Sequence, residues 1–432
     1  MNSIKDIAQY ALDALKKAGA DKASCHASKN RKDEFNIEAN AFSLLRTVFD
    51  DSLQLKALVN GRKGVAVINK LDRDSINAAV ENCIALAKAS EPDEAEDISP
   101  LVENRDFVLG DNKNDIDGLF SRSKEYLAQI RDEFPKILID GFTSDCQSGE
   151  AAYVNSNGVC FGKKFEYYRF TSMFVSKEGN KASSFCGDGA VLRDMSRPFI
   201  DSGMHRRLLE ESTRSIETRG IDEKFTGKII VTPACSDMIW GTILDNFLQD
   251  RAMIEGTSRW KDALGTAVAD SKLTMRAAPL HEKIAGGSRY TIDGFITHDV
   301  DLIRDGVLKS FALGLYGANK TGKPRTDSSF SNIEVLPGDT AFADMLKSVK
   351  HGVLVNRFSG GSPGASGDIS GVAKNSFLIE NGVITDALQE TMISFNIIDA
   401  LNNLTAISKE TVSNGHTVLP WCCFDGVTVS GK

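Results

Sequence analysis

The sequence has 432 residues, a formal charge of −8 at pH 7, 41% hydrophobic residues and 25% charged residues. These values are typical of a soluble globular protein with two or three domains. Because the chain is acidic and shows no block of Lys or Arg, we do not expect nucleic acid to be its main partner. It also has no run of about 18 apolar residues that could span a membrane.

The first ninety residues have the pattern of a helix, several strands and a second helix. Apolar residues recur at helical spacing from Ile4 to Ala18, which predicts an amphipathic first helix. Strand-like segments follow, and we expect the polar residues 50–52 to form a hairpin turn between two of them. A helix is predicted over 71–90, with Asp74 or Ser75 as its N-cap and an apolar face made of Ile76, Ala79, Val80, Cys83, Ile84 and Ala87.

A second unit of the same kind follows an acidic segment. Residues 91–113 contain two prolines and several carboxylates, which is typical of a linker. Helix, strands and helix are then predicted over 114–220, with a tight turn at 156–158 and a last helix that Gly220 closes. We therefore assign residues 1–220 to an N-terminal α+β domain built of two helix–strands–helix units, about 1–90 and 114–220.

The pattern changes from residue 221 onward. Short strands separated by glycine-containing turns predominate, and two helical segments, 234–253 and 340–350, interrupt them. Because turn-connected strands form antiparallel sheet, we predict an α+β fold in which residues 221–432 make a C-terminal antiparallel, barrel-like β-rich domain.

The eight cysteines include no C-x-x-C pair. This usage indicates thiols that stay reduced and buried in a cytoplasmic protein. Cys422 and Cys423 are adjacent in a strand-like segment, so their side chains should point to opposite faces, which disfavours a shared metal.

No common catalytic motif is complete. Residues 317–323 approach a phosphate-binding loop, but a proline follows where a hydroxyl residue is needed. His281-Glu282 begins a zinc-peptidase motif, yet Ala285 and Gly286 stand where a second histidine would lie. No G-x-S-x-G segment marks a serine nucleophile.

Residues 351–408 carry a distinctive order of motifs. They run through G-x-x-V, a glycine-rich stretch at 357–371, G-D-x-S and F-L-I-E-N-G. Other segments in the same order along the chain are RKGVAVINK, YVNSNGV, EGTSRWKDALGTAVAD and RDGVLKSFAL. In these motifs the chain resembles the TldD/PmbA family, formerly called modulators of DNA gyrase, over nearly its whole length.

The resemblance implies one of two kinds of subunit. TldD-like members carry H-E-x-x-x-H and a C-terminal cysteine that hold zinc for peptide cleavage, whereas PmbA/TldE-like members lack them and pair with the first kind. Counted back from the G-T-S turn at 256–258, the histidine positions hold Gly241 and Asn246, and Thr242 replaces the glutamate. The ligand cysteine is missing as well. The resemblance therefore implies no catalytic residue, metal ligand or cofactor in this chain, with zinc expected in a TldD-like partner.

The implied function is that of a PmbA/TldE-like component of a cytosolic zinc metallopeptidase system that degrades or matures unstructured peptides. The partner would be a TldD-like subunit or a second copy of this chain. Whether this chain cleaves peptides itself stays open. One alternative is a homodimeric peptide-binding protein or peptidase that acts alone. Another, which the acidic charge disfavours, is a modulator of DNA topology.

The glycine-rich stretch 357–371 is interpreted as a shaped loop between two strands. Its glycines permit positive φ and close backbone approach, which the edge of a peptide channel would use, whereas an ordinary turn is the alternative. Arg357 and Asp368 either form an ion pair that holds the loop or are two solvated charges. The candidate substrate-binding residues lie here and in the G-T-S turn: Arg357, Gly360, Gly361, Ser362, Asp368, Thr257 and Ser258.

Overall fold

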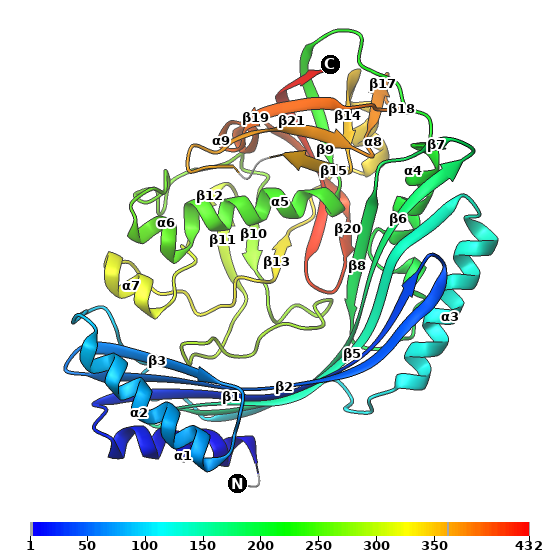
Figure 1. The fold of residues 1–432 in the computed structure, drawn as a ribbon. Helices are drawn as coiled ribbons and strands as arrows, with labels where there is room; N and C mark the ends of the chain where they lie inside the picture. The colour runs from blue at the N-terminus through cyan, green and yellow to red at the C-terminus, as the bar shows by residue number, and fades with distance from the viewer. Residues whose placement is uncertain (1–2, 361–362, 432) are drawn as a thin grey trace.

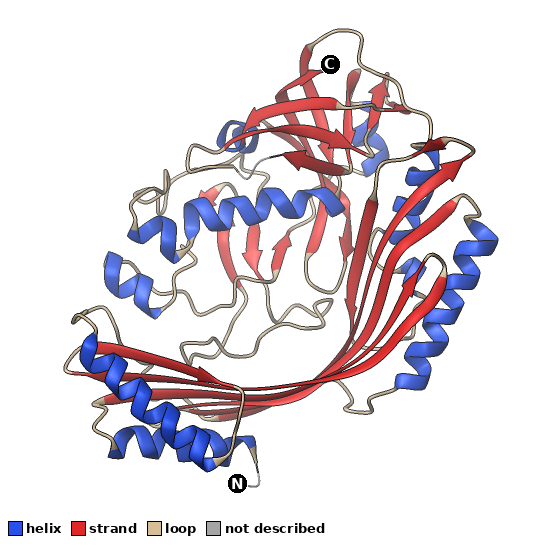
Figure 2. Cartoon of the chain, viewed as in Figure 1, coloured by secondary structure: helices blue, strands red, loops and turns tan. Residues whose placement is uncertain are grey.

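The computed structural model describes residues 3–360 and 363–431, which form two large β-sheets with helices around them. Figure 1 shows the N-terminal sheet as a curved cradle, with α1, α2 and α3 on its convex side. The C-terminal elements lie on the concave side, and the same view coloured by secondary structure shows their strands with helices around them (Figure 2). The predicted α+β class is confirmed.

The N-terminal sheet has the strand order β3-β2-β1-β5-β6-β4, with β7 and β8 attached to β6. Because β1 pairs with β5 along fourteen positions, from Ser24–Asn155 to Ile37–Phe142, the strands of the two predicted units share one sheet. The strands are β1 (Lys22–Glu38), β2 (Ala41–Val59), β3 (Arg62–Ile68), β4 (Arg105–Leu109), β5 (Ile137–Asn155), β6 (Cys160–Glu178), β7 (Lys181–Ala182) and β8 (Cys186–Leu192).

The hairpin turn between β1 and β2 lies at Ala39-Asn40, so the turn predicted at 50–52 is wrong. Ala39 and Asn40 both have positive φ, +48° and +64°, which matches the twist of long hairpin strands. The Asn40 side chain also accepts a hydrogen bond from the backbone of Ile139 at 3.0 Å. Residues 50–52 continue β2 and pair with residues 28–30 of β1, because an exposed strand edge tolerates polar residues without turning.

The predicted helices are present close to their expected limits, with two corrections, whereas the short helices Leu315–Thr321 and Ile397–Asn402 were not predicted. Asp72, and not Asp74 or Ser75, caps the second helix, because its carboxylate accepts the Ser75 amide at 2.9 Å. All six residues of the predicted apolar face are buried. The helices and helical turns are α1 (Ile4–Lys17), α2 (Arg73–Ala89), α3 (Ile116–Glu133), η1 (Phe199–Asp201), α4 (His205–Arg214), α5 (Pro233–Ile243), η2 (Leu244–Leu248), α6 (Asp250–Ile254), α7 (Leu315–Thr321), α8 (Phe342–Lys347) and α9 (Ile397–Asn402).

The second correction concerns α4, which ends at Arg214 and does not reach Gly220. Past this helix the chain becomes extended. Arg219 donates its backbone N–H to Ala387 at 2.8 Å, and its carbonyl accepts from Gln389 at 2.9 Å. Pairing with the C-terminal sheet therefore replaces the last predicted turns of helix.

The C-terminal sheet has thirteen strands, and most neighbours are antiparallel. Two parallel pairs, β9 with β14 and β13 with β21, make the sheet mixed. Its strands are β9 (Phe225–Val231), β10 (Met275–Ala277), β11 (Val300–Arg304), β12 (Val307–Leu308), β13 (Ile333–Val335), β14 (His351–Val355), β15 (Arg357–Gly360), β16 (Asp368–Lys374), β17 (Phe377–Glu380), β18 (Val383–Ala387), β19 (Thr391–Asn396), β20 (Leu404–Ser413) and β21 (Val418–Ser430).

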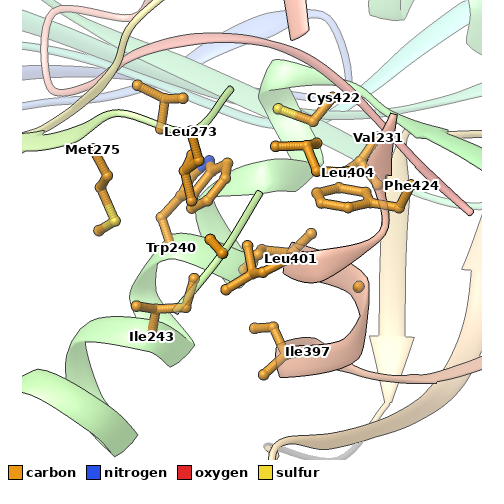
Figure 3. Close-up of a cluster of buried hydrophobic side chains, with 14 of the residues drawn as sticks. Val231, Trp240, Ile243, Leu273, Met275, Ile397, Leu401, Leu404, Cys422 and Phe424 are labelled. Atoms are coloured by element: carbon orange, nitrogen blue, oxygen red, sulfur yellow. The ribbon is translucent and has the colours of Figure 1, made fainter. Parts of the chain in front are cut away.

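Helix α5 packs its apolar face onto this sheet. Trp240 of α5 is fully buried, and Figure 3 shows it among side chains of α9 and β21, including Leu401 and Phe424. Cys422 belongs to this cluster, whereas Cys423 belongs to the cluster on the other face of β21, beside α4 and β14. The expected opposite orientation of the two thiols is confirmed. Among the described residues, no helix is long and apolar enough to cross a membrane.

A buried carboxyl on β8 makes the stability of this fold depend on pH. One oxygen of Asp188 is buried without a hydrogen-bond partner among the described residues, and burial raises the pKa of Asp188 to about 7. The group is therefore protonated in the folded chain at a pH where it is ionised in the unfolded chain. Its contribution to stability is full below pH 3.8 and is lost as the pH rises towards 7.

We expect Asp188→Asn to stabilise the protein at pH 8 by on the order of 1–3 kcal/mol, because the amide needs no proton to be neutral. Urea unfolding at pH 5 and pH 8 measures this, and Asp140→Asn, at an exposed carboxyl of β5, is the matched control. An Asp188→Asn variant that is less stable at pH 8 would contradict the account.

Candidate functional site

The helix that would carry the zinc ligands in a TldD-like subunit is α5 together with η2. Pro233 opens α5, a position where a missing N–H costs nothing. At Leu244 the chain changes to a five-residue π-helical segment that ends at Leu248. Such segments are rare and occur often at functional sites. This change of helical pitch lies inside residues 241–246, the window in which the family resemblance places the zinc ligands of TldD-like members.

The three positions of this window have different surroundings. A Cβ built on Gly241 would meet none of the described atoms within 4 Å, so this position borders open space. Thr242 is buried and donates its hydroxyl to the carbonyl of Met238, one turn back, at 2.8 Å. Asn246 donates its amide to the carbonyl of Pro363 at 2.9 Å and to that of Gly364 at 3.3 Å. The last position of the window therefore contacts the glycine-rich stretch directly.

The glycine-rich stretch is a β-hairpin. β15 and β16 pair antiparallel from Arg357–Lys374 to Gly360–Gly371. A Cβ on Gly371 would lie 2.7 Å from the Cα of Gly360, and one on Gly360 would lie 2.6 Å from the carbonyl of Ser370. The two strands therefore approach each other as closely as only glycine allows. Gly361 and Ser362 lie outside the described residues.

Three polar side chains bond to residues 363–368, which lead from the hairpin loop into β16. Only one of them, Asn246, had been singled out from the sequence. Besides Asn246, Arg259 donates to the carbonyl of Ser366 at 3.2 Å. Asn396 donates to the same carbonyl and to the Asp368 carboxylate, both at 2.9 Å. Asn396 also caps α9, which is the one local signal that could have identified it. We call residues 363–368 with Asn246, Arg259 and Asn396 the loop clamp.

The predicted binding residues of the hairpin are at the surface but do not form one cluster. Arg357 donates to the carbonyl of Phe185, whereas Asp368 starts the opposite strand. Arg357 and Asp368 are not bonded to each other, since Asp368 accepts from Asn396, and both are exposed, so the ion-pair alternative is wrong and two solvated charges describe them better. Hydrogen bonds from Asn396 and Ser366 hold the pKa of Asp368 below its usual value.

The two residues of the G-T-S turn differ in exposure. Ser258 is 2% exposed, and its hydroxyl donates to the carbonyl of Phe247 at 2.7 Å while accepting the N–H of Trp260 at 3.1 Å. It therefore ties the turn to the end of η2. Thr257 is exposed and lies two residues before Arg259 of the loop clamp in the sequence.

Comparison with known proteins agrees with this architecture. Residues 225–431 match the family model described as the PmbA/TldA metallopeptidase C-terminal domain. The chain is 22% identical over 455 aligned positions to the metalloprotease PmbA homolog of Haemophilus influenzae, which covers 99% of this chain and 96% of that protein. The C-terminal half thus carries the family's C-terminal domain, and the relatives that extend over the whole length support a TldD/PmbA family member. The resemblance of the chain to that family, inferred from the motifs, is confirmed.

Other similar proteins extend over most of the chain or part of it. Metalloprotease PmbA of Escherichia coli O157:H7 is 22% identical over 410 residues, 89% of this chain and 86% of that protein. A metalloprotease of Methanocaldococcus jannaschii is 25% identical over 195 residues, and the match covers 43% of that protein. TldE from Thermococcus kodakarensis has the same fold, with a TM-score of 0.87 at 18% identity over 98% of this chain and all of that one.

Zinc does not fit residues 241–246, where the resemblance to TldD-like members places its ligands. Protein zinc sites are built from imidazole, thiolate and carboxylate groups, and Gly241, Thr242 and Asn246 offer none of these. Across residues 3–360 and 363–431 no group of three His, Cys, Asp or Glu side chains is placed to hold a metal. The nearest thiol on α5, Cys235, is no substitute, because burial raises its pKa to about 12.

A substitution at the glycine pair tests whether the close approach of β15 and β16 is required. We expect Gly371→Ala to destabilise the protein by about 1–3 kcal/mol, because its methyl group would press on the backbone of Gly360 and Ser359. Gly364→Ala is the matched control, since its Cβ would meet no described atom within 4 Å and its φ is not positive. Thermal melts of both variants decide it, and equal melting temperatures would show that the pair has room for a side chain.

Proposed function

We propose that this chain is the PmbA/TldE-like, non-catalytic component of a cytosolic zinc metallopeptidase system that acts on unstructured peptides. The observation that carries this proposal is that residues 241–246, the window expected to hold zinc in TldD-like members, have no zinc-binding side chain at Gly241, Thr242 or Asn246. The last position of this window is an amide that binds backbone carbonyls of the hairpin, and its first position has no side chain. Without a metal to activate water, the chain lacks the nucleophile of this reaction.

In this role the chain forms part of the wall of a peptide channel, in a complex whose other subunit holds the metal. The loop clamp presents the glycine-rich hairpin at the end of η2, where a TldD-like subunit would hold its metal. Backbone groups at the tip of such a hairpin can pair with an extended peptide without reading its sequence, which suits unstructured substrates. Zinc and the catalytic groups then come from the TldD-like partner.

An exposed strand edge supports the view that the chain works in a complex. β3 covers only residues 53–59 of β2, so residues 41–52 form an edge that no described strand pairs on its outer side. Large apolar side chains are exposed on both faces of this edge, and Leu45 and Phe49 are 62% and 72% exposed. An unpaired apolar edge of this length is a hazard for a monomer and is typical of an interface. The apolar residues of this β2 edge are Phe42, Leu44, Leu45, Val48 and Phe49.

The proposed division of labour predicts the outcome of a mixing experiment. We expect the purified chain alone to leave an unstructured peptide such as casein fragments intact, whereas its mixture with an H-E-x-x-x-H-bearing relative from the same genome cleaves it. Each subunit alone is the control, and a chelator should abolish the cleavage by the mixture. Chelator-sensitive cleavage by this chain alone would instead favour the alternative of a peptidase that needs no partner.

The β2 edge predicts association. We expect the chain to form a dimer at micromolar concentration, with itself or with a TldD-like subunit, through an interface on the order of 2,000 Å². Leu45→Lys combined with Phe49→Lys should give a monomer, because two charges would be buried unpaired. Val108→Lys, at an exposed apolar residue of β4, is the matched control. Light scattering measures all three, and a wild-type chain that stays monomeric both alone and with the relative would contradict the prediction.

A further inference from the structure

A cavity of about 680 Å³ lies just beyond the end of η2, outside the loop clamp. It is bounded by the start of α6, by residues 288–293, and by the segment from α7 to residue 331. Its volume is in the range of pockets that hold small organic ligands or short peptide segments, about 300–1,000 Å³. The wall mixes apolar and hydroxyl side chains: Ile292, Leu315, Phe330, Ser288, Ser328 and Ser329.

One of the two carboxylates in this wall is neutralised. Asp293 accepts two hydrogen bonds from the Arg325 guanidinium, at 3.0 and 3.2 Å, and one from the backbone of Leu315 at 2.8 Å. Arg325 lies 3.5 Å over the ring of Phe295 and is 11% exposed, so it is fixed in place. Burial alone would raise the pKa of Asp293, but the Arg325 hydrogen bonds hold it below its usual value.

The other carboxylate, Asp250, has no such partner. None of the ion pairs among the described residues includes Asp250, and its carboxylate accepts hydrogen bonds from the backbone of Gly314, at 3.0 Å, and of Gly317. A Cβ on Gly317 would lie 2.1 Å from the oxygen that accepts from Gly314, so glycine there keeps the carboxylate in position. Burial raises the pKa of Asp250 and the charge of Asp293 adds to the rise, while the backbone hydrogen bonds from Gly314 and Gly317 and the charge of Arg325 oppose it. The cavity wall therefore holds one carboxylate that no ion pair of the described residues neutralises.

A second polar group of the wall is also unsatisfied. The hydroxyl of Tyr290 has no hydrogen-bond partner among the described residues, and the residue is 8% exposed. Its ring is held by Phe161 and Phe107, at centroid distances of 5.2 and 6.2 Å. Buried polar groups without a partner are rare in folded proteins and call for an explanation.

We propose that this cavity is a subsite for a primary ammonium group carried by an apolar chain, which Asp250 binds through its carboxylate. This inference rests on the proposed peptide-binding role and specifies the end of the substrate that the chain recognises. The ammonium group is either the N-terminus of a peptide or a lysine side chain. The apolar wall at Ile292, Leu315 and Phe330 takes the hydrocarbon part, and the serine hydroxyls take the first peptide groups.

The charge of the cavity favours this ligand class over others. A free carboxylate or phosphate would face Asp250 and Asp293. Arg325, the cation among the described residues that line the cavity, already forms ion pairs with Asp293 and Asp327. A neutral ligand would leave the Asp250 charge uncompensated. Hydrogen bonds between charged partners are the strongest ones available in such a site.

Calorimetric titration of the full chain with three short amidated peptides tests the proposal. The first, Leu-Ala-Ser-Ala, has a free N-terminus, the second is its N-acetylated form, and the third is N-acetylated with a lysine in place of the serine. We expect the first peptide, the third or both to bind at least about tenfold more tightly than the second. Which of them binds distinguishes the two sources of the ammonium group.

Two variants and one control variant link the binding preference to the cavity. Asp250→Asn keeps the acceptor for Gly314 and should remove the preference for the ammonium group, whereas Asp237→Asn, on the exposed face of α5, should keep it. Ser329→Phe fills the cavity without touching Asp250 and should weaken binding of the preferred peptide. Equal binding of all three peptides, binding of none, or an unchanged preference in Asp250→Asn would overturn the inference. Cleavage by the mixture with the TldD-like relative tests the proposed function separately.

Discussion

The amide side chain of Asn246 bonds to two carbonyls of the glycine-rich hairpin, and the arrangement of the site depends on this contact. It joins the end of η2 to residues 363 and 364, which are more than a hundred positions away in sequence. A histidine that ligates metal at this position could not hold the loop through two donated N–H bonds to carbonyls. Asn246 thus supports the loop at the position where the resemblance to TldD-like members places a zinc ligand.

The hairpin can meet Asn246 because its strands approach closely at Gly360 and Gly371. Arg259 and Asn396 then fix the carbonyl of Ser366 from the other side. These donors come from the turn after α6 and from the cap of α9, so distant segments converge on one short loop. The cavity beside Asp250 lies just beyond the end of η2, the segment that carries Asn246. In the proposed complex the two features would bound one peptide path, with backbone pairing at the hairpin and charge recognition at the cavity.

Much of this architecture could be predicted from the sequence, and the failures have physical causes. The apolar face of α2 and the opposite orientation of Cys422 and Cys423 follow from periodicity alone, and both are observed. The turn at Ala39-Asn40 was missed because polar residues at 50–52 imitate a turn, while backbone twist decides where a long hairpin reverses. The stretch 317–323, which resembles a phosphate loop, contains the end of α7 (Leu315–Thr321) and its left-handed cap, Gly322. The loop clamp and the cavity depend on long-range contacts that no local pattern encodes.

The zinc content of the purified chain tests the central claim most directly. The chain should be expressed with zinc in the medium, dialysed against a weak chelator and analysed by mass spectrometry for bound metals. The account predicts far less than one zinc per chain, because Gly241, Thr242 and Asn246 supply no zinc ligand. One zinc per chain that survives dialysis would contradict it and would return catalysis to this subunit.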